Sequence, residues 1–303
     1  MKQFVTKILL FFVLAAVIDI ACGWAFNELR SKARGGQSFK NEYISNVCED
    51  ELLILGSSKA AHHYVSSVFR DSLGVSCYNA GEEGCGIIPA YMRYHLVCSR
   101  KKPKMVLYDL APAFDYYQDM GGYGKYLGIV RPYADRLEVE KMYLDFSDEL
   151  EKIRLVSAMY RNNSKLIGNL KDMLSPAPEL KGYEPLYGKM ATQTTGTKTK
   201  VKEGTERAID EKKLNYLERL IKEAQSDGVK IVFIISPTIY DEGDLDYKPA
   251  YDLCETYNVP MINNLNCGFL RENTDLFQDR VHLNDKGAIL YSDYVVQQIK
   301  GLL

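Results

Sequence analysis

Short apolar runs that alternate with helical patterns are the feature that most constrains the fold of this 303-residue chain. Two of the runs, at 104–109 and 230–235, are apolar almost throughout, as strands are when both faces of their sheet are covered. Strands that alternate with helices predict a parallel sheet in a doubly wound α/β domain. The strand candidates are 52–55, 75–78, 105–110, 230–235 and 260–262, and the helix candidates are 60–72, 87–99, 210–227, 247–257 and 285–300.

The N-terminus carries a segment typical of a membrane anchor. Residues 8–26 are apolar except for Asp19, and their number is close to the roughly 20 residues that span a bilayer as a helix. No convincing cleavage site follows, so we expect an uncleaved signal anchor. Lys2 and Lys7 precede the run, which favours a single-pass inner-membrane protein with a cytoplasmic N-terminus and a periplasmic body. Because a carboxylate is costly in lipid, Asp19 should face a partner or lie near the interface.

The predicted organisation has three parts. Residues 1–28 form the anchor, residues 29–50 form a polar stalk, and residues 51–303 form the α/β domain. The regular alternation stops between 112 and 208, which indicates a long insertion with a charged helical pattern at 137–173. A polar segment at 192–204 is more typical of a loop than of a site, although lids over active sites have similar composition.

Composition excludes several classes of function. A formal net charge of -2 gives no reason to expect a nucleic-acid partner. The seven cysteines show no zinc-binding spacing, and the loop after the first strand has neither a Gly-x-Gly-x-x-Gly pattern nor a P-loop lysine. The sequence therefore implies no metal and no cofactor.

Three residues form a candidate catalytic set. Ser58 follows the first strand, where a serine can present its hydroxyl at the rim of the sheet, although a serine there can also simply cap the next helix. Asp279 lies three residues before His282, and both precede the last helix. An acid at that spacing can hold the imidazole in one tautomer, so that its other nitrogen can take a proton from Ser58.

Further candidates surround this set. Asn79 and Gly81 follow the second strand, and the Gly81 amide, the Asn79 side chain and the Ser58 amide are candidate oxyanion donors. The same segment can also be a plain strand-to-helix turn. His62 lies four residues after Ser58, on the same helix face, and Asp109 ends the third strand. Both are candidate pocket residues, with a surface position as the alternative for His62.

These segments together resemble the SGNH/GDSL hydrolase superfamily, over about 50–110 and 228–300. Within it, the chain resembles the membrane-anchored bacterial branch with a Gly-Ser-Ser first block. The resemblance implies a flavodoxin-like three-layer α/β/α fold with a mostly parallel five-stranded sheet. The family's third block, Gly-x-Asn-Asp, is absent after the third strand. The matching segments are Gly56-Ser57-Ser58, which implies Ser58 as nucleophile, Asn79-Ala80-Gly81, which implies Gly81 as oxyanion donor, and Asp279-Arg280-Val281-His282, which implies the acid and the base.

The resemblance implies a membrane-anchored serine esterase or O-acyltransferase. Its expected substrate is an acylated glycan or another small ester, with acetyl groups of a cell-envelope or exported polysaccharide as the leading candidates. The alternative is a catalytically inactive SGNH-like module for envelope glycan binding or assembly, which the missing third block suggests. An α/β-hydrolase nucleophile elbow is rejected, because Ser58 follows the first strand rather than a later one.

Overall fold

The computed structural model describes residues 1–119, 121–174, 179–190, 207–239 and 244–303, without the side chains of 137 and 138. The predicted polar loop at 192–204 lies outside the described residues. The chain forms two compact units. The helical unit comprises the described residues of Met1–Val47 and Tyr123–Pro178, and the α/β unit comprises those of Cys48–Gly122 and Glu179–Leu303.

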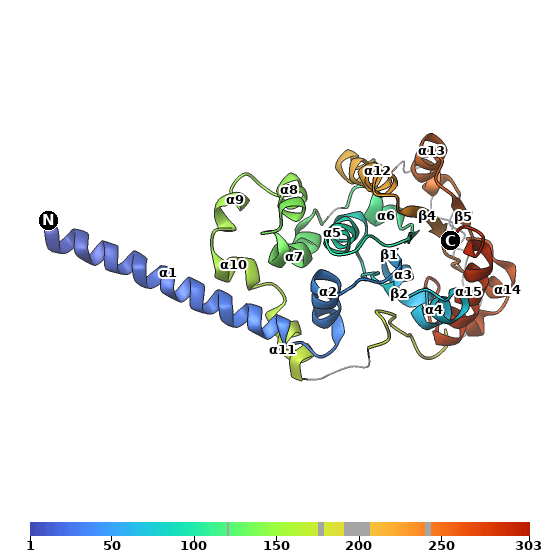
Figure 1. Ribbon diagram of the computed structural model, residues 1–303, viewed down its shortest axis with the longest axis horizontal. Helices are drawn as coiled ribbons and strands as arrows, with labels where there is room; N and C mark the ends of the chain where they lie inside the picture. The colour runs from blue at the N-terminus through green and yellow to red at the C-terminus, as the bar shows by residue number, and fades with distance from the viewer. Residues whose placement is uncertain (120, 175–178, 191–206, 240–243) are drawn as a thin grey trace. The chain divides into compact units, whose positions relative to one another are not determined.

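The α/β unit is built on a five-stranded sheet of order β2-β1-β3-β4-β5 (Figure 1). All four pairings are parallel, so the predicted parallel sheet is confirmed. The order reverses beside β1, which is the arrangement of flavodoxin-like folds. The strands are β1 (Leu52–Gly56), β2 (Cys77–Asn79), β3 (Met105–Asp109), β4 (Lys230–Ile235) and β5 (Met261–Asn263).

Helices cover both faces of this sheet, as the apolar strands predict (Figure 1). Alternate strand residues such as Leu52 and Ile54 pack with α3, α4 and α15, while α5 and α12 pack against each other and contact β1 and β4. The helices of the unit are α3 (Ser58–His63), α4 (Ser66–Leu73), α5 (Ile87–Cys98), α6 (Pro112–Asp115), α12 (Glu211–Ser226), α13 (Lys248–Tyr257), α14 (Gly268–Arg271) and α15 (Asp285–Ile299), with 3-10 turns at Asp244–Tyr247 and Thr274–Leu276.

The predicted helix at 60–72 is wrong in one respect, because it breaks between α3 and α4. Tyr64 and Val65 have extended backbone there. The Tyr64 carbonyl accepts a hydrogen bond from the Asn79 side chain at 2.9 Å, and the Val65 N–H donates to the Ser292 hydroxyl at 2.8 Å. These tertiary hydrogen bonds satisfy the backbone groups that a continuous helix would have used.

The helical unit joins segments that lie far apart in the sequence. The Ser38 hydroxyl donates to Asn169 at 2.9 Å, and the Asp172 carbonyl accepts from the Arg34 N–H at 3.1 Å. Residues 29–50, the predicted stalk, include a helix at Gly36–Asn46 that belongs to this compact unit. The helices are α1 (Lys2–Ser31), α2 (Gly36–Asn46), α7 (Gly124–Val130), α8 (Leu137–Asp145), α9 (Glu151–Arg154), α10 (Ala158–Asn162) and α11 (Leu166–Leu174), with a 3-10 turn at Arg131–Tyr133.

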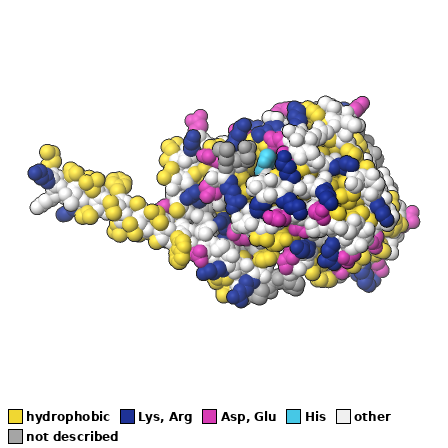
Figure 2. Space-filling view, viewed as in Figure 1, with side chains coloured by type: hydrophobic (Ala, Val, Ile, Leu, Met, Phe, Trp, Pro, Cys, Tyr) yellow, Lys and Arg dark blue, Asp and Glu magenta, His cyan; other side chains and the backbone are white. Residues whose placement is uncertain are grey.

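Helix α1 has the length and apolar composition of a membrane-spanning helix, criteria that a signal sequence also meets. Its N-terminal part exposes mostly hydrophobic side chains, which are visible on the face shown in Figure 2. The C-terminal part packs on α10, α11 and α2. An apolar N-terminal helix is thus present as predicted, and only its second half has protein neighbours in the described part of its own unit.

Candidate active site

Ser58 stands at the carboxyl end of β1, as the first residue of α3. The turn before it depends on Gly56, which has φ +136°, and a Cβ there would lie 2.5 Å from the carbonyl oxygen of Asp109. A side chain at this position would therefore push β1 away from β3. The Ser58 side chain is half-buried, and neither it nor Ser57 caps the helix. The cap interpretation of these serines is not supported.

His282 brings its ring to Ser58 from the loop before α15. Its Nε2 lies 2.8 Å from the Ser58 Oγ, and its Nδ1 lies 2.9 Å from Oδ2 and 3.1 Å from Oδ1 of Asp279. The structure thus brings the three sequence-predicted residues into one chain of hydrogen bonds. This is the order of contacts that a serine nucleophile, a base and an orienting acid need.

The loop that carries His282 is fixed by hydrogen bonds at both ends. Oδ1 of Asp279 accepts the N–H groups of Val281 at 2.7 Å and His282 at 2.8 Å. Asn284 caps α15 by accepting from the Gly287 N–H at 3.1 Å. Partial burial opposes ionisation of Asp279, but the hydrogen bonds from the His282 ring and the two amides hold its pKa below the usual range. Asp279 is therefore ionised at neutral pH.

His63 also holds the loop that carries His282. Its Nε2 accepts the N–H of Leu283 at 3.0 Å, so that nitrogen carries no proton. The ring has no exposed surface, and its Nδ1 has no hydrogen-bond partner among the described residues. Burial lowers the pKa of His63 well below its ordinary value, and the charges of His282, Lys59 and His62 lower it further. His63 is thus a neutral residue that positions the backbone beside His282.

His62 packs directly against His282, at 5.5 Å between ring centroids and nearly perpendicular. It is almost fully buried, so it is no surface residue. Its Nδ1 donates to the carbonyl of Glu184 at 2.6 Å, and its Nε2 lies 2.7 Å from a carboxylate oxygen of Glu83. The prediction that His62 lies at the site agrees with this position, although its nitrogens point to Glu184 and Glu83.

Asn79 and Gly81 do not have the geometry predicted for oxyanion donors. The Asn79 amide donates to the carbonyls of Ala60 at 2.6 Å and Tyr64 at 2.9 Å, and its Oδ1 accepts the Gly81 N–H at 3.0 Å. A Cβ on Gly81 would lie 2.4 Å from the Ala61 nitrogen. Both residues therefore clamp the loop after β2 onto α3. Of the three predicted donors, only the Ser58 amide, at the first position of α3, has no such internal use within the described part of the chain.

Asp109 is almost completely buried and does not line an open pocket. Its carboxylate accepts hydrogen bonds from the hydroxyl of Tyr64, at 2.5 Å, and from that of Ser236. Nearby, Lys59 is also buried, with Nζ 3.9 Å from Asp109 and 3.4 Å from the Tyr247 hydroxyl. The prediction of Asp109 as a pocket residue is corrected to a structural role. The carboxylate ties β3 to β4 and to the end of α3.

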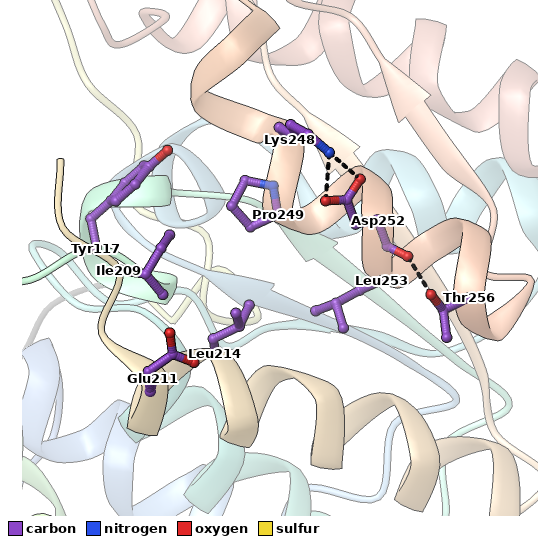
Figure 3. A pocket seen from close by; sticks show the side chains of 9 residues that line it. All are labelled: Tyr117, Ile209, Glu211, Leu214, Lys248, Pro249, Asp252, Leu253 and Thr256. Atoms are coloured by element: carbon purple, nitrogen blue, oxygen red, sulfur yellow. Dashed lines mark hydrogen bonds and ion pairs between the residues drawn. The ribbon is translucent and has the colours of Figure 1, made fainter. Parts of the chain in front are cut away.

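A groove of about 440 Å³ lies elsewhere in the α/β unit, between α12 and α13 (Figure 3). Lys248 and Asp252 form an ion pair on one wall, with Nζ 2.7 Å from the carboxylate. The groove shares no residue with the Ser58, His282 and Asp279 cluster. Its lining residues are Tyr117, Ile209, Glu211, Leu214, Lys248, Pro249, Asp252, Leu253 and Thr256.

Three residues at the cluster were not singled out from the sequence: Lys59, His63 and Glu83. A signal for the first two was available. Four of the six residues in α3 are polar or charged, yet Lys59, His62 and His63 are all buried. Basic residues inside a helix that directly follows a buried strand indicate a polar interior at that end of the sheet. The contact of Glu83 with His62 depends on the path of the loop after β2, and no local sequence pattern predicts that path.

No protein-family model and no curated protein sequence matches the chain. Among solved structures, it is similar to a psychrotrophic esterase from Pseudoalteromonas, with TM-score 0.43, 14% identity, and 83% and 97% of the two chains covered. A lipase/acylhydrolase from Enterococcus faecalis gives TM-score 0.41, 15% identity, and 84% and 97% coverage. An acetyl xylan esterase gives 0.39, 12%, and 82% and 99%.

Proposed function

We propose that the chain is a membrane-anchored serine esterase or O-acyltransferase of SGNH type, with Ser58, His282 and Asp279 as its catalytic residues. One observation carries the proposal. The Ser58 Oγ, the two nitrogens of the His282 ring and the Asp279 carboxylate form a continuous chain with contacts of 2.8 and 2.9 Å. The serine stands at the carboxyl end of β1, and the strand order of the sheet reverses beside this strand. Ligands bind at this place in open parallel sheets.

The geometry supports acyl transfer through a covalent intermediate. His282 Nε2 takes the proton of Ser58 as its Oγ forms a bond to the acyl carbon. Asp279, ionised and hydrogen-bonded to Nδ1, stabilises the imidazolium and holds the ring. The tetrahedral intermediate collapses when the imidazolium returns its proton to the leaving alcohol oxygen. The Ser58 N–H is the donor available for the oxyanion. A second alcohol or water, deprotonated by His282, then attacks the acyl carbon, and the new tetrahedral intermediate collapses as the bond to the Ser58 Oγ breaks and the imidazolium returns its proton to that oxygen.

The acyl acceptor decides between esterase and acyltransferase. Water gives an esterase, and a sugar hydroxyl gives an O-acyltransferase. We propose acetyl groups of a cell-envelope or exported polysaccharide as the natural substrate, in keeping with the predicted export of the α/β unit. Incubation with an acetyl donor and a candidate oligosaccharide separates the two, because transfer leaves the acetyl mass on the glycan and hydrolysis leaves free acetate.

We propose that α1 crosses the inner membrane once, with the α/β unit in the periplasm. The apolar helix and the basic residues Lys2 and Lys7 at its N-terminus support this orientation. Fusion of alkaline phosphatase to the C-terminus should give an active phosphatase, which requires export. Fluorescence from a C-terminal green fluorescent protein combined with an inactive phosphatase fusion would contradict the orientation.

Hydrolysis of a chromogenic acetyl ester tests the catalytic proposal. Ser58→Ala should lower kcat by about 10⁴-fold or more, because triad nucleophiles act as a unit with their base. Ser57→Ala is the matched control. The Ser57 hydroxyl is buried with no hydrogen-bond partner among the described residues, so its loss should leave the rate nearly unchanged. Equal rates for wild type and Ser58→Ala would refute Ser58 as the nucleophile.

A second candidate is a catalytically inactive SGNH-like module that binds or assembles envelope glycans. The observation that favours it is the internal use of Asn79 and the Gly81 amide, which leaves fewer oxyanion donors than the family pattern requires. Titration of the full chain with acetylated oligosaccharides distinguishes the two. Saturable binding without turnover, unaffected by Ser58→Ala, is expected of the binding module.

A further inference from the structure

The α9–α10 turn, defined as residues 150–159, comprises α9, the linker after it and the start of α10, and it exposes four large apolar side chains at a spacing of three residues. They are Leu150, Ile153, Val156 and Met159, with exposed fractions of 58%, 71%, 82% and 39%. Isolated exposed apolar residues are ordinary, but a regular row on one short segment is a surface that favours an apolar partner. Lys152 and Arg154, interleaved with this row, are exposed as well.

Asp19 of α1 holds this turn in place. Its carboxylate accepts the Ser157 hydroxyl and the N–H groups of Ala158, at 2.8 Å, and Met159, at 3.3 Å. Gly23, one turn further along α1, lets the two backbones approach closely, since a Cβ there would lie 2.5 Å from the Ala158 carbonyl carbon. The partner that a carboxylate in an apolar run requires is therefore the start of α10.

This contact fixes the position of the turn along the anchor. Asp19 lies inside the apolar run at 8–26, about 10 Å along the axis before its end at Phe26, at about 1.5 Å per residue. The part of α1 before Asp19 spans about 26 Å, slightly less than the roughly 30 Å hydrocarbon core. A bilayer that covers the run must therefore reach the level of Asp19, and Val156 adjoins the residues that contact Asp19.

Trp24 indicates where the bilayer ends along α1. It is the single tryptophan of the chain, it lies in the last part of the apolar run, and 65% of its surface is exposed. Tryptophan side chains concentrate at the level of the lipid headgroups, where one end of the ring is wet and the other is apolar. With Trp24 at that level, the turn beside Asp19 lies no farther from the bilayer centre than the headgroups.

We infer that the turn formed by residues 150–159 inserts its four apolar side chains into the interface of the bilayer that α1 crosses. The helical unit is then held to the membrane by two elements, a spanning helix and an interfacial turn, with Lys152 beside the headgroups and Arg154 paired to Asp148 and Glu151. This inference rests on the proposed membrane anchoring by α1 and adds the lipid surface as the partner of the turn. A second contact of this kind restricts the tilt of the unit on the membrane.

The single tryptophan allows a direct test in the full chain. In a Trp24→Phe background, one tryptophan is introduced at a time as Phe11→Trp, Val156→Trp or Val47→Trp. Phe11 reports on the anchor and Val156 on the turn. Val47 is the matched control, an exposed valine of the same unit at the C-terminal end of α2. Each variant is placed in lipid nanodiscs whose lipids carry bromine near the headgroup end of the acyl chains.

We expect bromine to quench the Val156→Trp variant almost as strongly as native Trp24 is quenched in the wild type, and to leave the Val47→Trp variant unquenched. If Val156→Trp behaves like Val47→Trp while Phe11→Trp is quenched, the inference is overturned and the anchor is kept. Protection of the Val156→Trp variant from acrylamide without bromine quenching also overturns the inference, because protein rather than lipid then covers the turn. Loss of quenching in Phe11→Trp shows instead that the proposed anchoring itself is wrong.

Discussion

Replacing His63 with glutamine tests whether a neutral histidine holds the catalytic loop. The His63 Nε2 accepts the Leu283 N–H, one residue after His282, and burial keeps the pKa of the ring well below 6.5. The glutamine side chain would place an amide oxygen near the position of Nε2 and cannot titrate. The substitution therefore removes the titration of the His63 ring and keeps a hydrogen-bond acceptor for the loop.

The magnitude follows from proton linkage. The folded-state pKa of His63 lies below the unfolded value of about 6.5, so below that pH the unfolded chain binds a proton that the folded chain refuses. The stability contributed by neutral His63 is complete above pH 6.5 and is lost as pH falls, by about 1.4 kcal/mol per pH unit. Between pH 7.5 and 5.5 the loss is at most about 1.4 kcal/mol, and it ends at the folded-state pKa.

Urea denaturation followed by far-UV circular dichroism measures this effect. The free energy of unfolding is compared between wild type and His63→Gln at several pH values, so that the titration of all other groups cancels. The wild type should lose more stability than the variant between pH 7.5 and 5.5, by up to about 1.4 kcal/mol. Parallel pH profiles for the two proteins would refute the reasoning, since His63 would then take up its proton as easily folded as unfolded.

Two further predictions concern the cluster. Asp279→Asn should lower kcat by up to about 10⁴-fold, because an amide at that position stabilises the wrong tautomer of His282. Since the pKa of Asp279 is lowered by folding, its contribution to stability is present above about pH 4 and disappears as pH falls further, which the difference between wild type and variant should show. Asn79→Ala should lower stability by about 2–4 kcal/mol, because the carbonyls of Ala60 and Tyr64 lose a buried donor. A kcat loss of about 10²–10³-fold at unchanged stability would mean instead that Asn79 serves the oxyanion.

The parallel sheet of the α/β unit was predictable because its signals are local. Continuous apolar runs mark the buried strands, and Asn284 marks the start of α15. The placement of Ser58 and His282 was predictable for a related reason. Parallel strands bring their carboxyl ends to one edge, so residues just after β1 and just before α15 reach the same place.

The rest depends on contacts between distant residues. Hydrogen bonds between Asp19 and Ser157, and between Ser38 and Asp172, join segments more than a hundred positions apart. No periodic pattern in the sequence predicts such pairs. The sequence therefore suggested a stalk where the structure has a packed helix. The orientation of the Asn79 side chain was not predictable from the sequence for a similar reason. Whether this side chain faces a pocket or binds the carbonyls at the end of α3 depends on where α3 ends.

Covalent labelling by a fluorophosphonate probe tests the central claim most directly, because the reaction requires a serine activated by its base. Wild type and Ser57→Ala should each gain one adduct, which peptide mass spectrometry places on Ser58. Ser58→Ala should gain none, and His282→Ala should react more slowly by orders of magnitude. An adduct on another residue, or equal labelling of wild type and Ser58→Ala, would contradict the account.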